Sequence, residues 1–110
     1  MAEKKFNVSK LTGIVGGDKS QMNELKTLFL SVNTQNLADL NIAYKDGQLI
    51  KVKEIAHKMK TSIDLWDIFE LKQDIRKIER LAQEGNNTKV LEQLIQKLNE
   101  VLNTVFAQMK

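Results

Sequence analysis

The sequence predicts an all-α protein, an antiparallel up-down four-helix bundle preceded by a short extra N-terminal helix. Proline is absent, and the five glycines stand mostly in a pair or near expected helix ends. Apolar residues recur at intervals of three and four over long stretches, and no stretch alternates as a β-strand does. Short turns between the long segments make consecutive helices antiparallel neighbours. At 110 residues we expect a single domain, residues 1–110.

The first predicted element is a short helix. Ser9 has the hydroxyl group of a typical N-cap residue, so we expect the helix to begin there. The apolar residues that follow are Leu11, Ile14 and Val15. The pair Gly16–Gly17 is predicted to end this helix, because glycine readily takes the left-handed conformation found at helix C-termini.

A long helix is predicted next. Asp18 and Gln21 have the spacing of a capping box, which marks a helix start, and the pattern continues to about Tyr44. Its apolar positions are Met22, Leu25, Phe29, Val32, Leu40 and Ala43. The polar residues 31–36 weaken the apolar pattern midway, so we expect a bend there.

The next predicted helix covers Leu49–Trp66, after a turn at Asp46–Gly47. Wound at about 100° per residue, its apolar residues form one stripe about 120° wide, as expected of a helix that packs on a core. The stripe consists of Leu49, Val52, Ile55, Ala56, Met59, Ile63 and Trp66. Trp66 is therefore expected to be a core residue.

Two further helices complete the predicted bundle. Asp67 and Glu70 have capping-box spacing, and the helix that they open is expected to end at Gly85. Its apolar residues are Leu71, Ile75, Ile78 and Leu81. After a loop at residues 86–88, the apolar positions of the last helix are Leu91, Leu94, Leu98, Val101 and Val105. This three-four spacing is typical of a bundle interface.

His57, the only histidine, lies roughly 140° from the centre of the apolar stripe on the helical wheel. We therefore expect an exposed imidazole. Lys53, Lys60 and Asp64 lie on one side of it, and Ile50, Glu54 and Thr61 lie on the other. Lys60, three residues on, can reach an anion placed on the ring, and Ile50 offers an apolar contact for a docking partner.

Two other interpretations of His57 have to be weighed. A lone histidine on a helix is most often a solvated polar residue. Glu54 and His57 also have the Glu-x-x-His spacing of di-iron helical bundles. Because that architecture needs the motif on two helices and the chain has no second histidine, we predict no metal site.

The string AHKMKTS at residues 56–62 resembles the signature of the histidine-containing phosphotransfer (HPt) domain family. The resemblance extends over nearly the whole chain. Residues 6–11 and the sequence Gly-Gly-Asp at 16–18 are similar to the short leading helix and turn of the family. Leu25, Leu28 and Phe29 fit its second helix, and residues 71–79 with 82–85 look like the helix after the phosphorylated one.

The resemblance implies a phosphorelay phosphocarrier, which is not an enzyme by itself. His57 would accept a phosphoryl group from a receiver-domain aspartate and pass it to another receiver, and Lys60 would stabilise the phosphate. Nε2 is expected to be the nucleophile because it is the outermost ring nitrogen. Ser62 is a candidate for phosphate contact, with a structural role as the alternative. The expected partner-binding residues are Ile50, Lys53, Lys58, Thr61 and Asp64.

The resemblance also implies the partners, which are response-regulator receiver domains, with a hybrid sensor histidine kinase as a further candidate. No cofactor is expected on this chain, since the magnesium that the transfer needs would be bound by the receiver. Two departures from the family favour an alternative, a non-catalytic helical adaptor that docks a signalling partner. Thr61 and Asp67 stand where the family usually has glycine, four and ten residues after the histidine.

Composition excludes several other classes. Cysteine is absent, so disulfides are not in use. The longest apolar run is three residues, whereas a membrane span needs roughly 20, and the first residues do not have the pattern of a secretory signal. The net charge of +3 comes from interleaved basic and acidic residues, without the basic stripe of nucleic-acid-binding proteins. We expect a cytoplasmic monomer that binds neither membranes nor nucleic acids.

Overall fold

The computed structural model describes residues 3–110, and the all-α prediction is confirmed for them. The helices are α1 (Ser9–Val15), α2 (Lys19–Lys45), α3 (Leu49–Leu65), the 3-10 turn η1 (Phe69–Leu71), α4 (Lys72–Gln83) and α5 (Lys89–Met109). No strand occurs within this range. None of the helices described is both long enough and apolar enough to cross a membrane.

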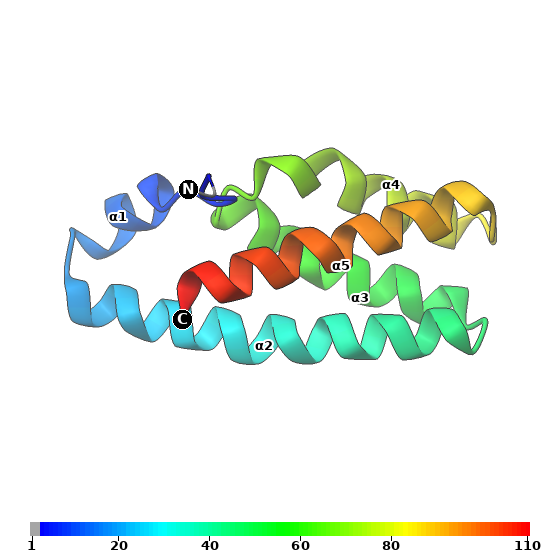
Figure 1. Ribbon diagram of the computed structural model, residues 1–110, viewed down its shortest axis with the longest axis horizontal. Helices are drawn as coiled ribbons and strands as arrows, with labels where there is room; N and C mark the ends of the chain where they lie inside the picture. The colour runs from blue at the N-terminus through cyan, green and yellow to red at the C-terminus, as the bar shows by residue number, and fades with distance from the viewer. Residues whose placement is uncertain (1–2) are drawn as a thin grey trace.

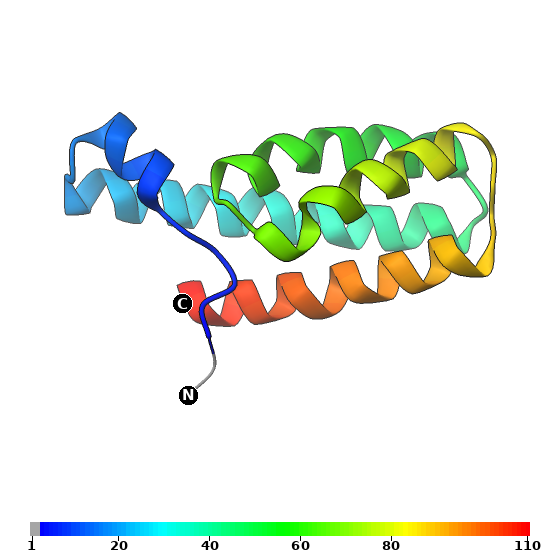
Figure 2. The ribbon, with the colours of Figure 1, turned by 90° about the horizontal axis from the view of Figure 1, so that it is seen from above.

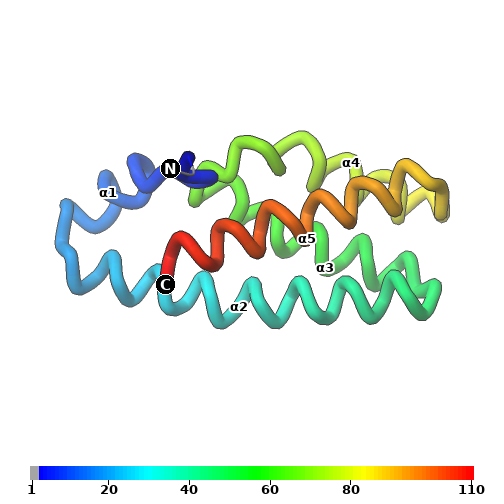
Figure 3. The backbone as a smooth tube through the Cα atoms, in the orientation of Figure 1, coloured from blue at the N-terminus to red at the C-terminus, as the bar shows by residue number. Residues whose placement is uncertain are grey.

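The four long helices lie side by side, and consecutive ones run in opposite directions (Figures 1 and 3). α3 packs between α2 and α4, with its most extensive contacts on α4, and α5 contacts α4 and α2. The N-terminal part of α2 extends beyond the end of α5, and α1 packs beside it (Figures 1 and 2). α3 and α4 are therefore a closely packed antiparallel pair.

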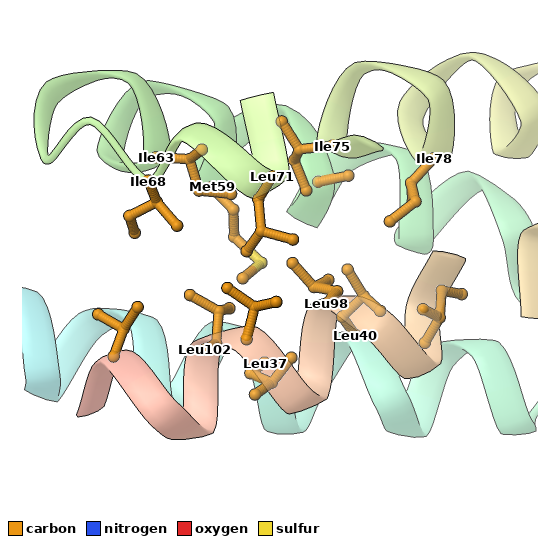
Figure 4. Packing of buried hydrophobic residues seen from close by; sticks show 14 of the residues in the cluster. Leu37, Leu40, Met59, Ile63, Ile68, Leu71, Ile75, Ile78, Leu98 and Leu102 are labelled. Atoms are coloured by element: carbon orange, nitrogen blue, oxygen red, sulfur yellow. The ribbon is translucent and has the colours of Figure 1, made fainter. Parts of the chain in front are cut away.

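The core is formed by the apolar stripes of the four long helices, which point toward one another between them (Figure 4). The α3 residues Val52, Ala56, Met59 and Ile63 are buried. Trp66 is also buried, which confirms its predicted place in the core, and its ring contacts Phe6 and Phe29, with centroids 6.1 and 5.2 Å away. Because one face of α3 is fixed against the core, the opposite face is fixed toward solvent.

The predicted bend in α2 is wrong, since the helix runs unbroken through residues 31–36 (Figure 1). Asn33 is buried there, and its side-chain amide donates a hydrogen bond to the carbonyl oxygen of Phe29 at 3.1 Å. This bond satisfies a polar group that would otherwise be costly to bury. Val32, which the spacing placed among the apolar positions of α2, is exposed, and so is Ile14 of α1.

Of the three predicted helix N-caps, at Ser9, Asp18 and Asp67, one is right and two are wrong. Asp18 is the N-cap of α2, and its carboxylate accepts a hydrogen bond from the backbone N–H of Gln21 at 3.1 Å. Ser9 is already the first residue of α1, and its N–H donates to the side chain of Asn7 at 2.8 Å. The predicted cap at Asp67 does not form, because this residue has a left-handed backbone, with φ of 51°.

Asp67 has a left-handed backbone in the turn after α3, at a position where the resemblance stated from the sequence led us to expect glycine. Glycine takes a positive φ without the steric cost that a Cβ atom brings, and aspartate tolerates it better than most residues do. The carboxylate also forms an ion pair with Lys72. The chain therefore makes the same turn after α3 that a glycine would permit.

We expect Asp67→Val to lower the melting temperature by several degrees, because a β-branched residue is strained at positive φ. The melting temperature of Asp67→Gly should stay close to that of the wild type, because glycine relieves the backbone strain and this gain offsets the loss of the ion pair with Lys72. Thermal unfolding followed by circular dichroism measures both variants. A glycine variant less stable than the valine variant would contradict this account of the turn.

Candidate functional site

His57 lies in the middle of α3, on the face opposite the core, and its side chain is 64% exposed. The exposed position that the helical wheel predicted is confirmed. The neighbouring Ala56 and Met59 are fully buried, so they fix the rotation of α3 about its axis. The imidazole is thus presented to solvent by a rigid helix.

Glu79 of α4 is the partner of the imidazole. One carboxylate oxygen, Oε2, lies 2.7 Å from Nδ1 of His57, and the other, Oε1, accepts a hydrogen bond from Nζ of Lys60 at 3.3 Å. The Glu79 side chain is only 17% exposed. A single carboxylate therefore links the histidine and the lysine that the sequence had singled out.

Glu79 is held in its ionised form. Burial raises the pKa of its carboxyl group, but the hydrogen bonds from His57 and Lys60 and their nearby charges outweigh burial, and the pKa lies below its ordinary value. An ionised carboxylate can only accept hydrogen bonds. Nδ1 of His57 therefore has to be the donor, so in the neutral ring Nε2 has the free lone pair.

This arrangement makes stability depend on pH. A carboxyl group whose pKa is lowered by folding stabilises the protein above its ordinary value of about 4.5, and this contribution disappears as the pH falls through the lowered pKa. We therefore expect the wild type to lose more free energy of unfolding than Glu79→Gln between pH 6 and pH 3. Urea unfolding at several pH values measures the difference. Parallel pH profiles of the two proteins would contradict the expectation.

Besides the contacts of Glu79, an ion pair between Arg76 and Asp64 links α3 and α4. Nη1 and Nη2 of Arg76 bind the two carboxylate oxygens of Asp64 at 3.1 and 2.6 Å. The hydrogen bonds from Arg76 hold the pKa of the Asp64 carboxyl below its ordinary value. Asp64, which the sequence suggested as a partner contact, is thus bound within the chain and ties α3 to α4.

Two hollows lie along the solvent-exposed face of α3. One, of about 390 Å³, is lined by Lys53, Glu54, His57, Lys58 and Glu79. The other, of about 400 Å³, lies between α2 and α3 and is lined by Asp39, Ile42, Ala43, Asp46, Gln48, Lys51, Glu54, Ile55 and Lys58. Glu54 and Lys58 line both hollows, so the second begins where the histidine site ends.

The structure brings only some of the expected site residues to the imidazole. Lys53 and Lys58 line the hollow beside it, whereas Lys60 reaches it through Glu79. Thr61 is exposed one turn along the same helix, and Ser62 is half-buried. Ile50 is exposed at the start of α3.

Sequence reasoning gave no role to two residues at this surface. Glu79 follows the buried Ile78 and lies at the border of the apolar stripe of α4. This border position was the feature of the sequence that could have identified Glu79 as a site residue. Ile42 of α2 is an exposed apolar residue on the second hollow, and it lies away from the apolar stripe of its own helix. The place of each residue at this surface depends on how its helix is aligned with α3, α4 in the case of Glu79 and α2 in the case of Ile42.

In comparisons with known proteins, no family model matches the chain, and neither does a curated protein or a solved structure. In the part of the chain described, no group of three or more histidine, cysteine, aspartate or glutamate side chains is placed to hold a metal ion. The residues around His57 are therefore the basis for a functional assignment.

Proposed function

We propose that this chain is a phosphorelay phosphocarrier of the HPt type, an antiparallel up-down four-helix bundle in which His57 is the phosphoryl acceptor. One observation supports this above all: the exposed imidazole has Nδ1 bound to the ionised Glu79 at 2.7 Å. When the ring is neutral, this bond places its proton on Nδ1, so the lone pair is on Nε2, the ring nitrogen that does not contact Glu79. An imidazole held in one tautomer on a rigid helix is prepared for nucleophilic attack.

The reaction follows from this tautomer. The lone pair of Nε2 attacks the phosphorus of an aspartyl phosphate on a receiver domain, and the N–P bond forms as the P–O bond to the aspartate breaks. The aspartate leaves as a carboxylate. Nδ1 keeps its proton, so the ring becomes an N-phosphoimidazolium whose positive charge is balanced by Glu79. Transfer to a second receiver is the same step in reverse.

The distribution of charge suits an acidic partner. α3 and α4 each have four basic and two acidic residues, a net charge of +2 on each helix, whereas α5 has two of each sign. The positive charge is thus concentrated on the two helices that form the site. The electrostatic field of this positive charge accelerates association with a negatively charged partner. A receiver domain, which is phosphorylated on an aspartate, is expected to be such a partner.

Two exposed isoleucines on the helices around the site are the apolar contacts proposed for docking. Ile42 and Ile50 are exposed on α2 and α3, and Ile42 lines the hollow that continues from the site. A contact of this limited size favours rapid dissociation, which a relay needs. We propose that a receiver domain covers these isoleucines when its aspartate reaches Nε2.

The test is phosphoryl transfer from receiver domains. Each receiver domain encoded in the same genome is charged with ³²P-phosphate, purified and mixed with the chain. We expect at least one to transfer its label within minutes, and the product to be acid-labile and base-stable, as phosphohistidine is. Absence of transfer from every receiver, or an acid-stable product, would overturn the proposal.

The second candidate is a helical adaptor without phosphoryl transfer. It is favoured by Thr61, which is exposed one turn from His57, where the resemblance to the HPt family leads us to expect the smaller glycine. An adaptor would bind a receiver in a titration followed by fluorescence anisotropy and take up no label from it. The two measurements on the same receivers therefore separate the candidates.

A further inference from the structure

We propose that Lys53, rather than Lys60, is the cation that neutralises a phosphoryl group on Nε2 of His57. This inference rests on the proposed function, because it concerns the phosphorylated form of the same site. A phosphoryl group adds between one and two negative charges near pH 7. A lysine that has no other anion to bind is best placed to meet that charge.

Lys60 already has an anion to bind. Its Nζ donates to Oε1 of Glu79 at 3.3 Å, and the lysine side chain is only 28% exposed. If Lys60 turned to a phosphoryl group, the poorly exposed Glu79 carboxylate would lose one of its two partners, and losing a hydrogen bond to a charged group is costly. Lys60 therefore acts on the reaction through Glu79.

Lys53 is placed differently. It lines the 390 Å³ hollow together with His57, whereas Lys60 does not. Lys53 lies four residues before His57, so the two residues are neighbours on the same face of α3. Lys53 is half-buried, and no carboxylate within residues 3–110 lies within ion-pair distance of it.

Lys89 provides a matched comparison. It is an exposed lysine at the start of α5 and does not line the hollow that contains His57. The same change of charge at position 89 therefore tests the effect of net charge alone.

The experiment measures the rate of phosphoryl uptake from a charged receiver by Lys53→Met, which removes the charge and keeps the length of the side chain. We expect a rate lowered by roughly tenfold, as for loss of one charge-assisted contact. Lys53→Arg should recover most of the rate, and the rate of Lys89→Met should stay within about twofold of that of the wild type. The ³¹P chemical shift of the phosphohistidine should also move in Lys53→Met.

A second pair of variants isolates Lys60. In a Glu79→Gln background, Lys60→Met should have no further effect, because its partner is already neutral, whereas Lys53→Met should still slow uptake. A Lys53→Met rate equal to that of Lys89→Met, with Lys60→Met slow in both backgrounds, would overturn the inference and restore Lys60. Labelling of the wild type would be unaffected by that outcome, so the proposed function is tested separately.

Discussion

Replacing His57 with glutamine is expected to abolish phosphoryl uptake completely. The glutamine amide can occupy a similar volume and donate to Glu79, but its nitrogen is not nucleophilic at neutral pH. The side chain is 64% exposed and away from the core, so the loss of one exposed pair should cost about 1 kcal/mol of stability or less. Incorporation of ³²P from a charged receiver measures the effect.

The control for this variant is a measurement of its folding. The circular dichroism spectrum and the melting temperature of His57→Gln should closely match those of the wild type, because Glu79 keeps its hydrogen bond from Lys60. A folded His57→Gln protein that still takes up label from the receiver would exclude His57 as the acceptor. Because the chain has no other histidine, such label would have to reside on another residue type.

Replacing Glu79 with alanine should have the second-largest effect. Without the carboxylate, Nδ1 loses its acceptor, so the ring can rotate and populate the tautomer that protonates Nε2. At metal sites, removing the group that orients a histidine costs roughly 10- to 100-fold, and we expect a loss of this size in the rate of uptake. Glu79→Gln should lose less, because its amide oxygen can still accept from Nδ1. Rapid-quench measurement of ³²P transfer gives the rates.

Asp64→Ala is the matched control for Glu79→Ala. It also removes an ion pair between α3 and α4, the one with Arg76, but it does not touch the imidazole. We therefore expect Asp64→Ala to transfer at close to the wild-type rate. If both variants slowed transfer equally, Glu79 would matter for holding the two helices together, and its proposed role in orienting the ring would be wrong.

The exposure of His57 could be predicted because it depends on one helix alone. Six apolar residues of α3, together with Trp66 directly after it, define a stripe with a period of 3.6 residues, and the opposite face then has to meet solvent. The buried Trp66 follows from the same stripe. Local periodicity failed in α2, where Asn33 is buried and Val32 is exposed.

The turn after α3 could be predicted only in part. The resemblance to the HPt family identified Asp67 as unusual, but the capping pattern with Glu70 suggested a helix start. The backbone instead turns with a positive φ at Asp67, and the next residues form η1 before α4 begins. A capping box and a left-handed turn use the same residue types, so sequence alone did not separate them.

The sequence by itself determined the helices, the buried faces of α3, α4 and α5, and the outward direction of the one histidine, because these depend on residues within a turn or two of each other. Only the tertiary structure decided that Glu79 binds His57 and Lys60 and that Arg76 engages Asp64. These contacts join α3 to α4, and they require one particular alignment of the two helices. Core side chains from all four long helices set that alignment together, and no local pattern encodes it.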